Sequence, residues 1–308
     1  MSVPGVRQRA GIVSVTGPRE TNEDAYFVSD DTLDSGFVSA RLAVADGMGG
    51  HHAGDVASSL AVATVAEALG PGSDLDGGAV EDAFARADQQ IRAYSRENAR
   101  GMSMGTTLTF VFVRGSEALI GHVGDSRAWL LHEGRLEQIT EDHSRVGQLL
   151  RSGAITEGEA LGHPEANVLE QALGAGDVPL VELRRVGIGP SDVLVLSSDG
   201  LHGVVSRGDI EAVLAGQVSM QHACEKLAAL AQQAGSGDNV TVVAWQYPLA
   251  RLRTATNPGR PPTHVAPPRP RPRSARMPTS AQDVRWLLLA VAFLAGVLNG
   301  VALRLAAR

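Results

Sequence analysis

Lysine is almost absent from the chain, because Lys226 is the one lysine among the 27 basic side chains of its 308 residues. A P-loop that cradles nucleotide phosphates needs a Gly-Lys pair, whereas Lys226 follows Glu225. A protein kinase needs a lysine on a strand early in the chain, and residues 1–225 contain none. The composition therefore excludes both of these nucleotide-dependent classes.

Cysteine is equally scarce, with Cys224 the single example. One cysteine allows neither an intrachain disulfide nor a metal site built from several thiolates. An enzyme with the cysteine nucleophile of many phosphatases would place an arginine six residues later, where this chain has Leu230. We therefore expect Cys224 to be a small buried side chain without a chemical role.

Positive charge is scarce in most of the chain. Residues 251–308 contain ten arginines and one aspartate, or +9, while the whole chain carries −7. Residues 1–250 must therefore carry −16. Nucleic-acid binding needs clustered positive charge against the phosphates, so we expect no nucleic-acid partner for this part of the chain.

Apolar runs of β type recur between about Gly11 and Tyr247, and helical periodicity interrupts them. The predicted strands are Gly11–Thr16, Ala25–Val28, Phe37–Ala45, Thr106–Val113, Ala118–Val123, Arg127–His132, Val181–Val186, Val193–Ser197 and Val240–Tyr247. The predicted helices are Ala53–Leu69, Val80–Asn98, Ser144–Ser152, Arg207–Ala215 and Met220–Ala234. Because the last four strands do not alternate tidily with helices, the pattern favours an α+β sandwich of sheets flanked by helices over a doubly wound parallel sheet.

The C-terminal part changes character. Residues 249–285 are rich in Pro and Arg and poor in large apolar residues, so we expect an extended, disordered linker. Trp286–Leu303 then runs for 18 residues without a charge, and a helix of that length spans roughly 27 Å, close to the thickness of a bilayer core. We predict a transmembrane helix here, with a docked amphipathic helix as the alternative, and a short tail at 304–308.

Arginine flanks this predicted span unevenly. Five arginines lie within 20 residues before it and two follow it. The positive-inside rule then predicts a single-pass protein of the cell inner membrane with residues 1–248 in the cytoplasm. The basic linker is expected to lie against anionic lipid of the inner leaflet.

Acidic residues gather in short loops at strand ends. These loops are Arg19-Glu-Thr-Asn-Glu-Asp24, Ala45-Asp-Gly-Met-Gly-Gly-His51, Gly124-Asp-Ser-Arg127, Ser198-Asp-Gly200 and Gly237-Asp-Asn239. Any one Asp-Gly pair is most often a plain β-turn. The set is different, because many carboxylates that converge without a cation would repel one another and raise their own pKa values. Carboxylates without cysteine suit hard dications such as Mg²⁺, Mn²⁺ or Ca²⁺.

Eight short motifs follow one another along this part of the chain. They are Gly17–Asp24, Val44–His51, Gly105–Thr107, Gly121–Arg127, Asp142–Ser144, Asn167–Gly174, Leu196–Gly200 and Gly237–Val243. In this order and spacing they resemble the PPM family, the metal-dependent type 2C serine/threonine protein phosphatases, in their bacterial form. The resemblance implies a central β-sandwich of two antiparallel sheets flanked by α-helices, and it makes residues 1–248 the catalytic domain.

For the site, the resemblance implies a centre of two Mn²⁺ or Mg²⁺ ions. Asp46, as a catalytic residue, would bridge both ions. Asp199 and Asp238 would complete the coordination of one ion, and Glu23 and the Gly47 carbonyl that of the other. A hydroxide bridging ions about 4 Å apart would attack phosphorus in line, so no essential cysteine is needed.

Other residues receive roles from the same resemblance. Asp24 and Arg19 would also be catalytic, Asp24 by holding water molecules of the ions and Arg19 by gripping the substrate phosphate with its guanidinium fork. Asp125, with Asp199, would hold a third, weaker ion. Many eukaryotic members have His after the bridging Asp-Gly pair, where this chain has Met48, so a metal-bound water would have to protonate the leaving oxygen.

The remaining motifs are expected to be structural. Gly105–Thr107 and Asp142–Ser144 are predicted to be strand-entry and helix-cap features rather than catalytic groups. Residues 144–167 resemble the family's mobile flap subdomain, which lies near the active site and tunes substrate choice.

The sequence thus predicts a protein phosphatase acting on phosphoserine and phosphothreonine, with phosphorylated Ser/Thr kinases and their targets as partners. Two alternatives stay open, a catalytically weak phosphatase-like scaffold and a small-molecule phosphatase. Metal-dependent hydrolysis that is lost in Asp46→Asn separates enzyme from scaffold, and kinetics on phosphopeptides against sugar phosphates separate the two enzymes.

Overall fold

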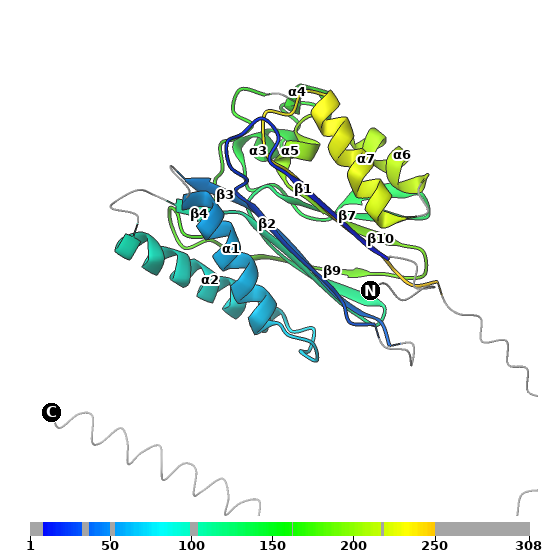
Figure 1. Ribbon diagram of the computed structural model, residues 1–308, viewed down its shortest axis with the longest axis horizontal. Coiled ribbons are helices and arrows are strands. Elements are labelled where there is room, and N and C mark those ends of the chain that lie inside the picture. The colour runs from blue at the N-terminus through cyan, green and yellow to red at the C-terminus, as the bar shows by residue number, and fades with distance from the viewer. Residues whose placement is uncertain are drawn as a thin grey trace, which may run out of the picture. The chain divides into compact units, whose positions relative to one another are not determined.

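The computed structural model describes residues 9–32, 37–49, 53–98, 104–161, 163–216 and 219–249. These residues build two antiparallel β-sheets, with helices on both outer faces (Figure 1). The first sheet has the strand order β1-β11-β10-β7-β8. The second has the order β2-β3-β5-β6-β9, and β4 pairs with the end of β3.

The elements have the following bounds. The strands are β1 (Ala10–Val15), β2 (Asp24–Asp30), β3 (Ser39–Gly49), β4 (Met104–Thr106), β5 (Leu108–Arg114), β6 (Glu117–Val123), β7 (Arg127–His132), β8 (Arg135–Gln138), β9 (Glu182–Gly187), β10 (Val193–Ser197) and β11 (Val240–Gln246). The helices are α1 (Ala53–Ala68), α2 (Gly77–Asn98), α3 (Arg145–Arg151), α4 (Glu157–Ala160), α5 (Asp199–His202), α6 (Arg207–Ala215) and α7 (Met220–Gln233).

Strand β3 illustrates why these residues form a sandwich. Its side chains alternate, with Leu42 and Val44 in the apolar cluster between the two sheets and Ala43 and Ala45 in the cluster that α1 and α2 cover. Because a strand in this position is buried on both faces, its sequence is an unbroken apolar run rather than a polar and apolar alternation.

Helices α5, α6 and α7 cover the outer face of the first sheet. Trp129 of β7 packs there with Leu227 and Cys224 of α7. Cys224 is fully buried, and burial raises the pKa of its thiol to about 12. The expectation of a structural cysteine is therefore confirmed.

The predicted α+β sandwich of two antiparallel sheets flanked by helices is confirmed by this arrangement. Three elements were missed, β8, α4 and α5, and each has only four residues, too few for a periodic pattern. The predicted helix cap is also confirmed, because the Ser144 side chain accepts from the Gly147 N–H at the start of α3.

Two differences from prediction affect the site. The run Thr106–Val113, predicted as one strand, is divided into β4 and β5, with Thr107 between them. The strand predicted to end at Ala45 continues to Gly49, so Asp46 and Gly47 lie in β3 rather than in a loop. Pairing with β4 explains the extension, because Gly47 is opposite Thr106 and Gly49 opposite Met104.

The predicted linker and membrane span are a separate matter. Within the described ranges, no helix combines the length and the apolar character needed to cross a bilayer. Trp286–Leu303, with residues 250–285 before it, lies outside those ranges. The transmembrane helix therefore stays a prediction.

Candidate metal centre

The site begins with two aspartates on neighbouring strands. Asp24 is the first residue of β2 and lies directly opposite Asp46 of β3. Opposed residues of an antiparallel pair point their side chains to the same face. The Ser198 hydroxyl donates to Asp24 Oδ2 at 2.8 Å, which ties the start of β2 to the end of β10 in the other sheet.

Two further aspartates come from the first sheet. Asp199 begins α5 shortly after β10, and Asp238 lies in the loop before β11, the neighbour of β10. A Cβ on Gly200 would lie 1.9 Å from the Asn239 carbonyl oxygen. Glycine at position 200 therefore lets the start of α5 approach the loop that carries Asp238.

Glu23 lies against the first turn of α1. A Cβ added to Gly54 would lie 2.8 Å from the Glu23 carboxylate carbon and 2.9 Å from Glu23 Oε2. Gly47 packs here as well. Its N–H donates to the Glu23 carbonyl oxygen at 3.1 Å, and a Cβ added to Gly47 would lie 2.1 Å from the Gly54 carbonyl oxygen. Glu23 and Gly47, predicted to share one ion, are thus brought into contact.

Electrostatics shows that the carboxylates converge. Burial raises the pKa of Asp46 well above its usual range, and the neighbouring charges of Asp24, Asp199, Asp125 and Asp238 raise it further. Burial likewise raises the pKa of Asp125, with the Asp199 charge next. For Asp199, burial and then Asp238 act in the same direction. The carboxylate of Asp46 is therefore within electrostatic reach of all the other predicted aspartates.

Asp24 and Glu23 titrate by the same physics. Burial raises the pKa of Asp24 to about 7, although hydrogen bonds from Thr241 and Ser198 oppose the effect. Burial also raises the pKa of Glu23, and the Asp55 charge adds to it while the Arg19 charge lowers it. A chain with this many disfavoured carboxylates gains by binding cations, which stabilise the charged forms.

Two carboxylate oxygens at this site are without partners. Asp24 Oδ1 and Asp199 Oδ1 are buried and accept no hydrogen bond within the described part of the chain. Buried polar atoms are nearly always satisfied, so an orphaned carboxylate oxygen calls for a ligand. Oxygen donors from carboxylates are what Mn²⁺ and Mg²⁺ prefer, and the donor set therefore fits these ions.

Arg19 is placed at the edge of the aspartate cluster. Its Nη2 donates to Asp238 Oδ2 at 2.6 Å and its Nε to the Gly237 carbonyl oxygen at 2.9 Å, while half of the side chain is exposed. The residue predicted to grip phosphate is thus oriented by a predicted metal ligand and faces solvent.

Asn239 is a site residue to which the sequence alone assigned no role. Its side-chain amide donates to the carbonyl oxygens of Thr16 and Thr21, at 2.8 and 2.9 Å. Its Oδ1 accepts from the Glu23 N–H at 2.8 Å. Asn239 therefore holds the loop that carries Arg19 and Glu23. The sequence feature that could have indicated this role is the position of Asn239 directly after Asp238.

A cleft of about 860 Å³ opens beside the cluster. Arg19, Asp125, Asp199 and Asp238 line one part of it, and the predicted flap, residues 144–167, lines another through α3 and α4. The flap prediction is confirmed in its position next to the acidic residues.

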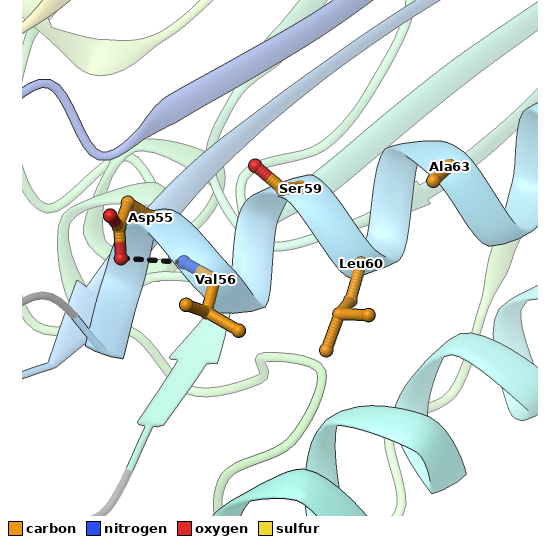
Figure 2. Close-up of a pocket in the computed structure, with 5 residues that line it drawn as sticks. All are labelled: Asp55, Val56, Ser59, Leu60 and Ala63. Carbon is orange, nitrogen blue, oxygen red and sulfur yellow. Dashed lines mark hydrogen bonds between the residues drawn. The ribbon is translucent and has the colours of Figure 1, made fainter.

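A second hollow lies along α1 and shares no lining residue with the cleft. Figure 2 shows its five lining residues, Asp55, Val56, Ser59, Leu60 and Ala63, all on one helix. Asp55 is their one ionisable residue, and its Oδ1 accepts from the Val56 N–H at 2.7 Å. This groove supplies no converging polar groups and is not a candidate site.

Within the described residues, a histidine cluster also has the composition of a metal site. Ligand atoms of His122, His143 and Glu182 lie within 4.8 Å of one another. Three of the four ring nitrogens are already used, however. His122 Nδ1 lies 2.9 Å from Thr109 Oγ1, His122 Nε2 lies 3.1 Å from the Glu141 carbonyl oxygen, and the Gly124 N–H donates to His143 Nδ1. We interpret the cluster as a brace for the Gly124 turn.

Comparison with known proteins decides the family. The sequence pattern of the family described as Protein phosphatase 2C matches residues 19–234, which is most of the chain. The chain belongs to the protein phosphatase 2C family. The resemblance stated from the motifs is therefore confirmed, and so is the prediction of a metal-dependent protein serine/threonine phosphatase.

Relatives of this phosphatase agree along most of their length. The serine/threonine phosphatase stp of Listeria welshimeri is 37% identical over 205 residues, which are 65% of this chain and 81% of that protein. Protein phosphatase PhpP of Streptococcus pneumoniae is 34% identical over 236 residues, 75% of this chain and 94% of that protein.

Solved structures resemble this phosphatase too. The Mycobacterium tuberculosis serine/threonine phosphatase PstP/Ppp is 34% identical with a TM-score of 0.69, over 78% of this chain and 98% of the other. The catalytic domain of PstP in complex with two manganese ions is 34% identical with a TM-score of 0.66, over 77% and 97% of the two chains.

Proposed function

We propose that this phosphatase hydrolyses phosphoserine and phosphothreonine in proteins at a centre of two Mn²⁺ or Mg²⁺ ions. Asp46 would be a ligand of both ions. Asp199 and Asp238 would hold one ion, and Glu23 and the Gly47 carbonyl would hold the other. The observation that carries this assignment is the meeting of Asp46 with Asp24 across β2 and β3, where Asp24 Oδ1 and Asp199 Oδ1 are buried without a partner among the described residues.

The chain's own groups then divide the work. When bound, the ions acidify water and take up charge that builds on the phosphoryl group. Arg19 binds phosphate oxygens through its exposed guanidinium, which the Gly237 carbonyl and Asp238 hold in place. One carboxylate oxygen of Asp24 accepts a hydrogen bond from the Ser198 hydroxyl. The other has no protein partner among the described residues and is available to bind water in the centre.

A third ion at Asp125 and Asp199 completes the proposal. Burial raises the pKa of Asp125, and the Asp199 charge raises it more than any other carboxylate does. Both residues line the cleft. The Arg127 charge opposes this effect, which favours a weaker ion here than at Asp46.

The test of the centre is a pair of measurements on wild type and Asp46→Asn. Calorimetric titration with Mn²⁺ should give ion binding in wild type and a large loss in the variant. Hydrolysis of a phosphothreonine peptide should fall at least 10³-fold, the scale of removing essential metal catalysis. Unchanged hydrolysis in folded Asp46→Asn, judged by circular dichroism, would refute the ligand assignment.

We also propose that the physiological substrates are phosphorylated proteins, including Ser/Thr kinases. The name of the Streptococcus relative, protein phosphatase PhpP, supports a protein substrate, and so does the volume of about 860 Å³ of the cleft that the acidic cluster and the flap line. Steady-state kinetics on phosphopeptides and on sugar phosphates provide the test. A higher kcat/KM on sugar phosphates would favour the small-molecule alternative.

Membrane attachment is a further part of the proposal. Trp286–Leu303 would anchor the chain in the inner membrane, with the arginine-rich linker at anionic lipid and the catalytic domain in the cytoplasm. Deleting Trp286–Arg308 should move the protein from the membrane pellet to the soluble fraction. Sedimentation with membranes after the deletion would contradict the anchor.

A further inference from the structure

The backbone of Asp46 is held at a break in the sheet. Strand β3 pairs with β5 as far as Val44 and with β4 from Gly47 onward, so Asp46 lies where the partner strand changes. Thr107 is the residue between β4 and β5. Its hydroxyl accepts the Asp46 N–H at 2.9 Å, and its own N–H donates to the Asp46 carbonyl oxygen at 2.9 Å. Thr107 thus satisfies both backbone groups of Asp46.

The same hydroxyl reaches the Asp125 turn. Thr107 Oγ1 lies 2.8 Å from Ser126 Oγ, and both side chains are buried. On the other side of Asp125, Gly124 has φ +109°, and a Cβ there would lie 2.6 Å from the Thr107 Cβ. Thr107 therefore contacts both chain neighbours of Asp125 while it holds Asp46.

The far side of this turn is fixed independently. The His143 N–H donates to the Gly124 carbonyl oxygen at 2.7 Å, and His143 Nδ1 accepts the Gly124 N–H at 3.2 Å. Thr109 Oγ1 donates to the Ser126 carbonyl oxygen at 2.9 Å. These contacts fix the side of the turn that faces away from Thr107. The contact with Thr107 then sets the distance between the turn and Asp46.

We propose that Thr107 is a positioning residue that sets the place of Asp125 relative to Asp46, and so couples the weaker ion of the centre to the other two. This role rests on the ligand roles proposed above for Asp46 and Asp125. The physical reason is that a buried hydroxyl bonded to two parts of the chain transmits small displacements, and ion binding is sensitive to ligand shifts below 1 Å.

The test compares three substitutions in the full chain. Thr107→Val keeps the shape but removes the hydroxyl, and Thr107→Ser keeps the hydroxyl. Thr64→Val is the matched control, because Thr64 of α1 is also buried and bonds Leu60 O and Gln90 Oε1 at 2.7 and 2.6 Å. Calorimetric titration with Mn²⁺ is the primary readout, and thermal unfolding in EDTA reports folding.

We expect Thr107→Val to weaken the lowest-affinity Mn²⁺ ion at least tenfold, with kcat reduced and KM for a phosphopeptide little changed. Thr107→Ser should restore wild-type binding within about threefold, and Thr64→Val should bind Mn²⁺ as wild type does. Equal effects of Thr107→Val and Thr64→Val would mean that only stability was lost, which overturns the proposal. If Thr107→Val does not fold, Ser126→Ala replaces it with the same expected loss.

A double-mutant cycle with Asp125→Asn separates this proposal from the one it rests on. The first comparison is Mn²⁺ binding by wild type and by Asp125→Asn alone. Loss of one bound ion in the variant supports the third-ion site. Unchanged binding overturns both that site and the role of Thr107. In the Asp125→Asn background, Thr107→Val should change the affinities of the remaining ions less than threefold. An undiminished effect there would show that Thr107 supports Asp46 only, and would refute the coupling while leaving the third ion intact.

Discussion

Arg19 Nη2 lies 2.6 Å from Asp238 Oδ2, so the arginine proposed to bind substrate phosphate is held by a proposed metal ligand. This ion pair links phosphate binding and ion binding through one carboxylate. Because half of the Arg19 side chain is exposed and its second anchor is a backbone carbonyl, the guanidinium keeps donors available to an incoming phosphate.

Replacement of Arg19 tests that division of labour. Arg19→Ala should lower kcat/KM on a phosphopeptide by roughly 10²–10³-fold, the effect of losing a preorganised donor, while Mn²⁺ binding by calorimetry is retained. The kcat/KM of Arg19→Lys should lie between those of wild type and Arg19→Ala, because lysine keeps the charge but lacks the guanidinium fork. Loss of Mn²⁺ binding in Arg19→Ala, with no change in kinetics at saturating metal, would contradict the assignment.

Stability should depend on pH through Asp24. Its pKa is about 7 in the fold against 3.8 for the ordinary group. A raised carboxyl pKa means that the folded chain binds this proton more tightly than the unfolded chain does. Asp24 therefore contributes its full stabilisation below about pH 4. This stabilisation, on the order of 4 kcal/mol, is lost as pH rises toward 7. Metal-free protein should therefore unfold at lower temperature at pH 8 than at pH 5.

Two controls accompany this pH profile. Asp24→Asn should make the slope smaller without abolishing it, because the amide does not titrate but Asp46, Asp125 and Asp199 still have raised pKa values. Mn²⁺ should raise the melting temperature more at pH 8 than at pH 5, since ions compete with protons for the carboxylates. A metal-free melting temperature that rises steadily between pH 5 and 8 would show that these carboxylates are not buried together.

Gly200 offers a test of the close approach between α5 and the Asp238 loop. Gly200→Ala would place a Cβ 1.9 Å from a backbone oxygen, so we expect a loss of about 1–3 kcal/mol in the free energy of unfolding and weaker Mn²⁺ binding. The matched control is Gly189→Ala, where no atom lies within 4 Å of the new Cβ. Urea unfolding measures both, and equal stabilities would refute the packing argument.

Asn239 offers a test of how the Arg19 and Glu23 loop is held. Asn239→Ala removes three hydrogen bonds and leaves partly buried backbone groups unpaired, which should cost about 2–3 kcal/mol in the free energy of unfolding. Mn²⁺ affinity should fall as well, because Glu23 loses its anchor. Asn98→Ala is the control, since Asn98 makes one exposed hydrogen bond and should change stability by less than about 0.5 kcal/mol.

Much of the fold was predictable because most of its strands and helices have a local pattern of apolar residues in the sequence. The alternation of Leu42 and Val44 with Ala43 and Ala45 belongs to a strand buried on both faces, and the helical periodicity of Val80–Asn98 falls within α2. The short elements β8, α4 and α5 were missed because tertiary contacts, rather than periodicity, stabilise them. The division at Thr107 was missed because it depends on pairing with a strand about 60 residues away.

The sequence by itself determined the chemistry: almost no lysine, one inert cysteine, and a set of acids next to glycines that no single turn explains. Tertiary structure alone decided how those acids meet. It placed Asp46 inside β3 opposite Asp24, left Asp24 Oδ1 and Asp199 Oδ1 without partners among the described residues, and assigned Asn239 and Thr107 to hold the ligands. The physical reason is that residue type sets what a side chain can bind, whereas strand register and burial, which join distant segments, set where it binds and at what pKa.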